Sequence, residues 1–201
     1  MAHDGLWEQL LEFDSELTKK RADCHYICEK NQYLLKMLNK KYVIDLKKRE
    51  IFSDGSDSEQ QPANFLEQLC LLAYLINSQD LPLAGMLVRA EELPSGQFFF
   101  RSLHRLPTEK LKRAFGSCPQ RLYEALSHFD AEKRSFGDAS IELRVFARIP
   151  LTIVIWRGDD EFDARASILF DRTASSHLPL DALLTAVKLA VDAVVEICGQ
   201  E

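Results

Sequence analysis

The sequence predicts an α+β protein with a mostly antiparallel sheet and helices packed mainly on one face, in a single domain. Residues 149–171 carry the first evidence, because two apolar runs flank a short acidic turn, a pattern typical of an antiparallel hairpin. Residues 137–148, directly before them, alternate apolar and polar side chains as a half-buried strand does. Residues 179–198 place apolar side chains at helical spacing, which predicts a long helix packed on the sheet.

The N-terminal part is expected to form a helix and a hairpin. Residues 1–21 are predicted to be an N-terminal helix capped by Asp4, and residues 22–198 to form the α+β domain itself. Within residues 33–52, apolar alternation on both sides of a central turn predicts a hairpin. The lysines along it are interpreted as protection of a sheet edge, with ligand binding as the less favoured alternative.

The middle of the chain is predicted to contain both helices and strands. Residues 53–62 have no apolar side chain and are expected to form a surface loop, whereas residues 65–76 are apolar almost all round and predict a central buried helix. A short strand is predicted within residues 85–93, and the three adjacent phenylalanines of residues 97–101 favour an aromatic strand. Residues 107–129 predict two consecutive helices.

Composition limits the partners and the compartment. The chain has 201 residues, 46% of them hydrophobic, which is enough for one globular core. A net charge of −6 argues against nonspecific binding to nucleic acid or to an anionic membrane. No signal peptide is recognised, and the five cysteines are scattered and odd in number, so a reduced cytoplasm is the expected location.

The acidic turn is the first candidate site. Its carboxylates are Asp159, Asp160, Glu161 and Asp163. Like charges about 4 Å apart repel by roughly 1 kcal/mol even in water, so the turn is solvated, paired with cations or holding a ligand. Ala164 stands where a calcium loop needs glycine, which argues against that motif. A divalent metal or a cationic partner remains one alternative, and a charged tip neutralised by Arg157 and Arg165 is the favoured one.

Histidines and a basic cluster are candidates for holding a cofactor. His25 lies between Cys24 and Cys28, in the wrong order for covalent haem attachment, but an imidazole can still be an axial ligand of haem or a corrinoid. Arg101, His104 and Arg105 belong to a basic stretch that suits the carboxylates or phosphates of a ligand. A structural histidine and a solvated basic face are the favoured alternatives.

Other catalytic motifs find little support. Ser175, Ser176 and His177 lie near Asp171 and supply the residue types of a hydrolytic triad, but no G-x-S-x-G sequence is present. Neither glycine-rich nucleotide-binding motif occurs, so nucleotide binding through such a loop is not predicted.

Several segments resemble a known family. They read LPLAGMLVRAEELPSG (81–96), FGDAS (136–140), PLTIVIWRGDDEFDARASILFD (150–171) and HLP (177–179). Through them the chain resembles the bacterial and archaeal family catalogued as domain of unknown function 3786, from about Ala22 to Val195. The resemblance implies a protein of anaerobes, related to corrinoid-dependent or iron–sulfur metabolism. Some members carry a cysteine-rich iron–sulfur domain, whereas this chain has no four-cysteine cluster.

These observations lead to three functional expectations. The first is a non-enzymatic accessory protein that binds a corrinoid, haem or similar cofactor, with Trp156 and His177 beside its pocket. The second is a small metal-dependent enzyme that uses the acidic turn and His177. The third is an interaction module for an anaerobic metalloenzyme. The oligomeric state is not predicted.

Overall fold

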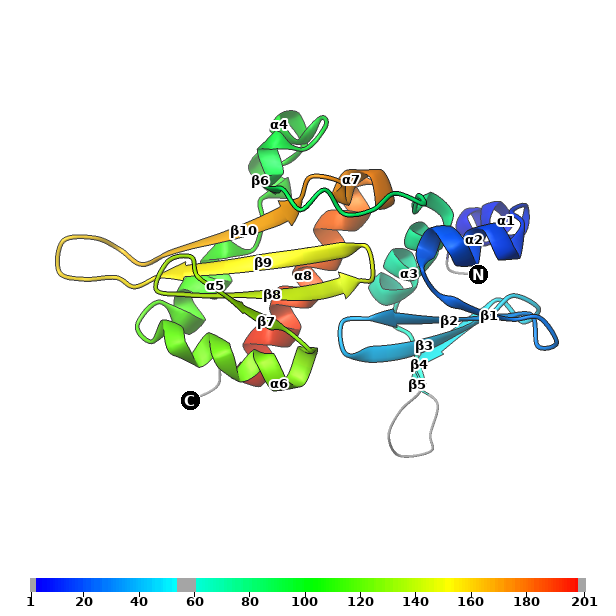
Figure 1. Cartoon of the computed structure of the whole chain (residues 1–201), viewed down its shortest axis with the longest axis horizontal. Coiled ribbons are helices and arrows are strands. Elements are labelled where there is room, and N and C mark those ends of the chain that lie inside the picture. Colours follow the sequence, from blue (N-terminus) through cyan, green and yellow to red (C-terminus); the bar gives the residue numbers. More distant parts are fainter. Residues whose placement is uncertain (1–2, 54–60, 199–201) are drawn as a thin grey trace.

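The computed structural model describes residues 3–53 and 61–198, and it confirms the α+β class. Its strands form two five-stranded antiparallel sheets, ordered β1-β2-β3-β4-β5 and β6-β10-β9-β8-β7, where the sequence had suggested one sheet. The sheets lie side by side along the long axis of the molecule (Figure 1). They touch where the Leu38 N–H donates to the Val145 carbonyl at 2.9 Å.

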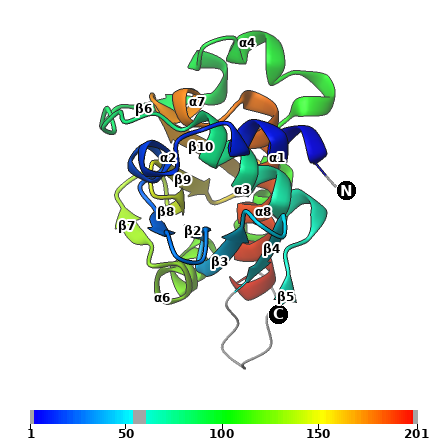
Figure 2. The ribbon, with the colours of Figure 1, turned by 90° about the vertical axis from the view of Figure 1, so that its right-hand side faces the viewer.

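Two short helices replace the single N-terminal helix that was predicted. They are α1 (Asp4–Leu11) and α2 (Ser15–Ala22), and the Asp14 side chain caps the second by accepting from the Leu17 N–H. Asp4 lies inside α1 and His3 occupies the cap position. Trp7 and Leu10 of α1 are buried in the core of the protein. In Figure 2 both helices lie on the same side of the first sheet, next to α3.

The first sheet is built by the predicted hairpin and its neighbours. Its strands are β1 (His25–Ile27), β2 (Gln32–Met37), β3 (Lys40–Asp45), β4 (Glu50–Ser53) and β5 (Gln61–Pro62). Alternation places Tyr33, Leu35 and Met37 of β2 in the core, while the intervening side chains face outward. Most of the predicted loop 53–62 lies outside the described residues.

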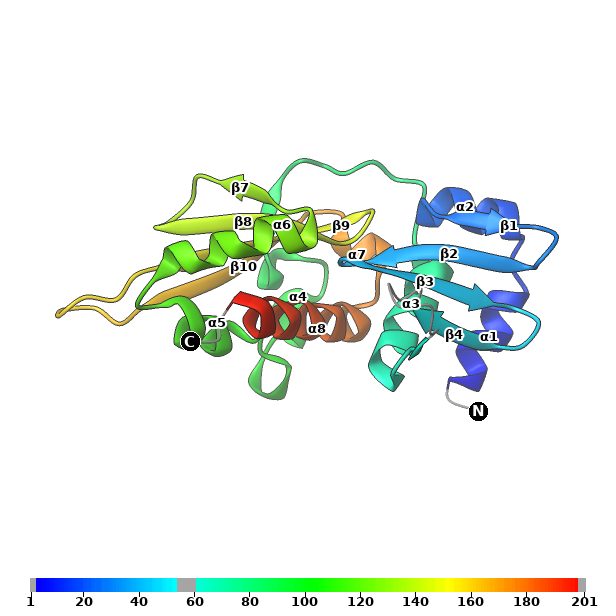
Figure 3. The same cartoon turned by 90° about the horizontal axis from the view of Figure 1, so that it is seen from below.

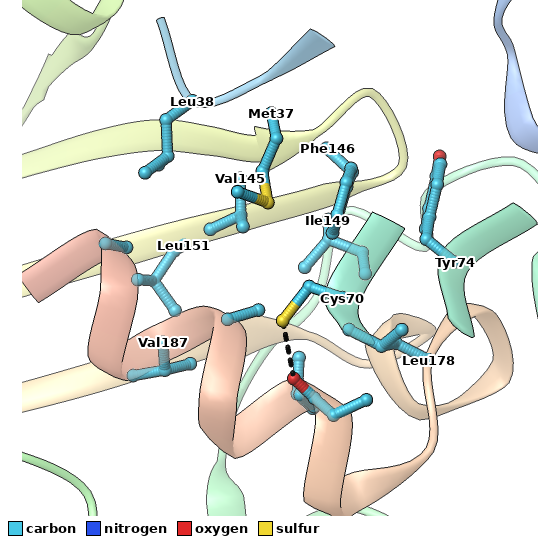
Figure 4. Close-up of a cluster of buried hydrophobic side chains, with 14 of the residues drawn as sticks. Met37, Leu38, Cys70, Tyr74, Val145, Phe146, Ile149, Leu151, Leu178 and Val187 are labelled. Atoms are coloured by element: carbon cyan, nitrogen blue, oxygen red, sulfur yellow. Dashed lines mark hydrogen bonds between the residues drawn. The ribbon is translucent and has the colours of Figure 1, made fainter. Parts of the chain in front are cut away.

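The predicted central helix is α3 (Phe65–Asn77), and seven of its residues are buried. A capping box fixes its start, because Asn64 accepts from the Glu67 N–H and the Glu67 side chain accepts from the Asn64 N–H. Figure 4 shows side chains of α3, both sheets and α8 meeting in one apolar cluster. Tyr74 stacks on Phe146 there, with ring centroids 4.2 Å apart.

The aromatic strand predicted at residues 97–101 is wrong, because this region is helical. The segment 87–104 begins with the short strand β6 (Leu87–Arg89). It continues with the 3-10 helix η1 (Ala90–Glu92), the helix α4 (Gly96–Phe99) and the 3-10 helix η2 (Ser102–His104). Ser95 adopts a left-handed conformation, and a Cβ at Gly96 would lie 1.9 Å from the Ala90 carbonyl oxygen. The chain therefore turns back over η1 at Ser95 and Gly96. This tertiary contact outweighs the preference of the phenylalanines for a strand.

The second sheet contains the predicted central hairpin. Its remaining strands are β7 (Glu132–Arg134), β8 (Ala139–Phe146), β9 (Ile149–Trp156) and β10 (Arg165–Asp171), and β9 pairs with both β8 and β10. The helical elements are α5 (Thr108–Phe115), η3 (Pro119–Glu124), α6 (Ala125–Phe129), α7 (Ala174–His177) and α8 (Leu180–Cys198). Figure 3 shows α5 and α8 on one side of these strands, as predicted. No described helix is long and apolar enough to cross a membrane.

The guanidinium of Arg148, between β8 and β9, joins α2 to the second sheet. It donates to the carbonyls of Lys20 and Arg21 at the end of α2, to the Leu81 carbonyl and to the Asp80 carboxylate, at distances between 2.7 and 3.1 Å. The last carbonyls of a helix have no partner within the helix, so Arg148 satisfies groups that would otherwise lie unpaired.

We expect Arg148→Ala to lower the free energy of unfolding by about 3 kcal/mol. Hydrogen bonds to charged groups contribute about 1.5–3 kcal/mol each, and water replaces part of this contribution at the exposed partners when the side chain is removed. Urea denaturation measures this loss. The matched control is Arg144→Ala near the same turn, where the guanidinium donates to the Ala147 carbonyl, and it should cost less than about 1 kcal/mol. Equal losses in the two variants would show that the Arg148 contacts do not hold the two parts together.

Candidate functional site

The acidic turn forms the exposed tip of the β9–β10 hairpin, at one end of the long axis (Figure 1). Asp159 shapes this tip, because its carboxylate accepts from the N–H groups of Glu161 and Phe162 at 2.9 and 2.7 Å. These bonds lower the pKa of Asp159. The other carboxylates, Asp160, Glu161 and Asp163, are exposed. Among the described residues, no three His, Cys, Asp or Glu side chains are grouped to hold a metal ion, and the metal site stays a prediction.

The arginines beside the turn do not pair with its carboxylates. The Arg165 guanidinium lies over the Trp156 ring, 5.4 Å from its centroid. At Arg157 the backbone N–H, rather than the side chain, donates to the Asp138 carboxylate. Phe162, which the sequence analysis did not single out, is 70% exposed in the middle of the acidic residues. The tip is therefore an acidic surface that presents one aromatic ring.

His177 is buried at the other end of β10, in α7. Its Nδ1 accepts from the Gln79 N–H at 3.3 Å, and Nε2 has no partner among the described residues. Nearby, the Asp171 carboxylate accepts from the N–H groups of Ala84 and Gly85 at 3.0 and 2.7 Å. The segments 81–96, 150–171 and 177–179 that carry the family resemblance thus meet here, and they hold the crossing between α3 and β6 in place.

The charges of this cluster follow from the same contacts. Burial disfavours the ionised form of Asp171, but hydrogen bonds from Thr173, Ala84 and Gly85 outweigh it and lower the pKa of the carboxyl. Burial and the positive charge of Arg148 lower the pKa of His177, although Asp171 opposes them. His177 is therefore a neutral, structural hydrogen-bond acceptor at neutral pH.

The structure does not bring His177 to the acidic turn. The seven residues of β10 lie between them, and at about 3.3 Å per residue this strand is roughly 20 Å long. The set of side chains assumed for a metal-dependent enzyme is thus divided between the two ends of one strand.

The predicted cofactor ligands in other elements are also apart. His25 is exposed on β1, in the first sheet, and burial raises the pKa of its neighbour Cys24 to about 12. His104 is exposed and stacks on Phe99, with ring centroids 4.5 Å apart. The Arg101 guanidinium lies over the ring of Phe98. Of the basic cluster, Arg105 alone lines the large groove described next.

This groove follows the edge of β10. It has a volume of about 1150 Å³ and is bounded by β6 and η1 on one side and by the start of α5 on the other. Its more buried lining includes the apolar side chains of Phe100, Leu106, Ala166 and Ile168 and the hydroxyl groups of Thr108 and Ser167. Its exposed ones are charged: Arg89, Glu91, Glu92, Arg105 and Glu109.

Part of β10 has no neighbouring strand in this groove. β10 pairs with β9 from Arg165 to Phe170 but with β6 only from Leu169 to Asp171, so the described structure leaves residues 165–168 as a free edge. The Arg172 N–H donates to the Met86 carbonyl on the β6 side. Because successive residues direct their backbone groups to alternate sides, those of Ala166 point towards the free edge.

The buried state of His177 predicts a pH-dependent stability. Its pKa in the folded protein lies below the ordinary value of 6.5, so the unfolded chain binds a proton first as the pH falls. The free energy of unfolding should therefore decrease between about pH 7 and pH 5, and His177→Leu should reduce this slope. Urea denaturation at several pH values measures it, with His25→Leu as the exposed control. Unchanged slopes in the His177 variant would contradict the prediction.

Comparison with known proteins gives a family and no function. No curated protein and no solved structure matches this chain. A family model described as a domain of unknown function, DUF3786, matches residues 14–193, which is most of the chain. This range includes all the strands of both sheets and the groove beside β10. The protein therefore belongs to the DUF3786 family.

Proposed function

We propose that this protein is a non-enzymatic accessory protein that binds an extended peptide segment of a partner along the free edge of β10. One observation carries the proposal, namely that Ala166 directs its backbone groups into a groove of about 1150 Å³. A peptide that adds a strand to a sheet edge gains affinity from main-chain hydrogen bonds and specificity from pockets for alternate side chains.

The lining of the groove suits such a peptide. Leu106 and Ile168 offer apolar contact to side chains that point inward. At the rim, Arg89 and Arg105 offer hydrogen bonds to carboxylates, and Glu91, Glu92 and Glu109 offer acceptors to basic groups. A free sheet edge is otherwise a liability, because it can pair with other chains. The short free segment, residues 165–168, limits the pairing to a few residues and favours a reversible contact.

Exposed apolar side chains flank the groove and extend this surface. Phe98 in α4 is 70% exposed and Leu103 in η2 is 91% exposed; Leu103 lies between the lining residues Phe100 and Arg105 in the chain, and Phe98 lies two residues before Phe100. Exposed apolar groups next to a groove are typical of protein interaction sites. A partner longer than the free edge would bury them.

The cofactor expectation is kept as a second candidate for the same groove, supported by Arg89 and Arg105 as partners for anionic substituents. Its test is a visible absorption titration with haem and with a corrinoid, in which Arg105→Glu should weaken any spectral shift. The partner class that the family resemblance suggests is an anaerobic metalloenzyme, which would supply the peptide segment.

We expect peptides selected for binding from a random ten-residue library to need the free edge. Ala166→Pro removes the N–H that faces the groove, so the affinity should fall about tenfold, the equivalent of 1.4 kcal/mol. Fluorescence polarisation with a labelled selected peptide measures this. The control is Lys133→Pro in β7, the opposite edge strand, and it should leave the affinity unchanged.

A change in the peptide tests the same contact without altering the protein. Two peptides are compared, one N-methylated at its odd-numbered residues and the other at its even-numbered residues. One of them should lose binding and the other should keep it, because only every second residue of an added strand directs its N–H towards β10. Equal binding of the two methylated peptides, or equal binding to the Ala166 and Lys133 variants, would contradict strand addition at this edge.

A further inference from the structure

A second surface, on the first sheet, has an apolar centre. The register aligns Leu34, Val43, Phe52 and Pro62 across β2, β3, β4 and β5 on the face opposite to the core. Together with Ile27 they line a groove of about 1040 Å³. In Figure 1 the helices α1, α2 and α3 lie above this sheet, on its other face. The outward face therefore carries partly exposed apolar side chains.

Positive charge surrounds this apolar centre. Residues 25–53 contain seven Lys and Arg against three Asp and Glu, a net charge of +4 in a chain whose total is −6. Lys30, Lys48 and Arg49 line the groove itself. Two carboxylates also line it: Glu50 is exposed, whereas Asp45 is already engaged, since it accepts from the Gln32 side chain and from the N–H groups of Lys47 and Lys48. The surface suits an acidic partner with an apolar group at its centre.

The chain itself carries a surface of this kind. At the tip of the β9–β10 hairpin, Phe162 projects its ring with 70% exposure, and four carboxylates surround it in the sequence. The tip is the eight-residue connection, residues 157–164, between β9 and β10. It lies at the opposite end of the long axis from the first sheet, so it cannot reach the groove of its own chain (Figure 1).

We propose that the groove on the outer face of the first sheet receives the acidic β9–β10 tip of a second copy of this chain. Phe162 would contact the apolar row that includes Val43 and Phe52, and the carboxylates of the tip would pair with Lys30, Lys48 and Arg49. Charge complementarity favours the acidic tip of a second copy as the occupant. A nucleic acid suits the groove less well, because the apolar lining is mainly aliphatic and offers one aromatic ring, Phe52, for stacking bases. This contact is independent of the groove beside β10.

The contact should be weak and sensitive to salt. A hairpin tip buries less area than the roughly 1,200–2,000 Å² of a standard stable interface, unless two copies exchange tips reciprocally. Charge pairs at an exposed rim are screened, with a Debye length of about 10 Å at 0.1 M salt and about 3 Å at 1 M. Self-association is therefore expected at high protein concentration and low salt.

Sedimentation velocity over a protein concentration series tests the proposal. In about 0.02 M salt, the weight-average mass should rise above the monomer mass of 23.0 kDa, and in about 0.5 M salt it should return towards it. Phe162→Ala, and separately the double variant Lys48→Glu with Arg49→Glu, should each prevent the rise. Leu17→Ala is the control, since this apolar side chain is 63% exposed on α2, which lies on the other face of the first sheet, and the variant should associate like the unchanged protein.

Mixing the two defective variants separates this contact from a general loss of solubility or folding. The Phe162 variant retains the groove, and the Lys48 and Arg49 variant retains the tip, so an equimolar mixture should form a complex of twice 23.0 kDa although neither associates alone. A chain that stays monomeric at low salt, variants that associate like the unchanged protein, or a mixture that does not recover would each overturn the proposal.

Discussion

The arrangement of the whole structure depends on the hydrogen bonds of the Arg148 guanidinium. This side chain leaves the turn between the two most buried strands and ends at the carbonyls of α2 and of Leu81. Because a planar guanidinium donates in several fixed directions, it fixes both α2 and the crossing segment relative to the second sheet. The first sheet then follows, since α3 and the Leu38–Val145 contact attach it to the same core.

Two residues of the segments that carry the family resemblance, Asp171 and His177, help to hold that frame together. Asp171 and His177 hold the crossing segment by accepting from its backbone N–H groups, and both are buried. Buried polar groups of this kind are stabilising only while their partners are in place, which ties distant parts of the sequence together. These segments therefore include a folding constraint, and they also supply part of the lining of the groove beside β10.

The two proposed binding surfaces are places where the sheets remain incomplete. β9 has a strand on each side, but β10 loses its second neighbour before Leu169, and the first sheet has helices over one face. Unpaired strand edges and partly apolar sheet faces are the features through which proteins add strands or dock other surfaces. This is why both proposals assign binding, rather than catalysis, to the molecule.

The sequence by itself determined most elements, because periodicity reports which side of an element is buried. It predicted α3, α8, the hairpin within residues 33–52 and the three strands from Ala139 to Asp171. It misassigned residues 97–101, where a turn at Ser95 and Gly96 overrides the preference of the phenylalanines. Only the tertiary structure decided that the strands form two sheets, that His177 is buried far from Asp159, and that Arg105 and Ala166 share a groove. Such pairings join residues distant in the chain, and local patterns carry no information about which distant partner a strand edge or side chain will meet.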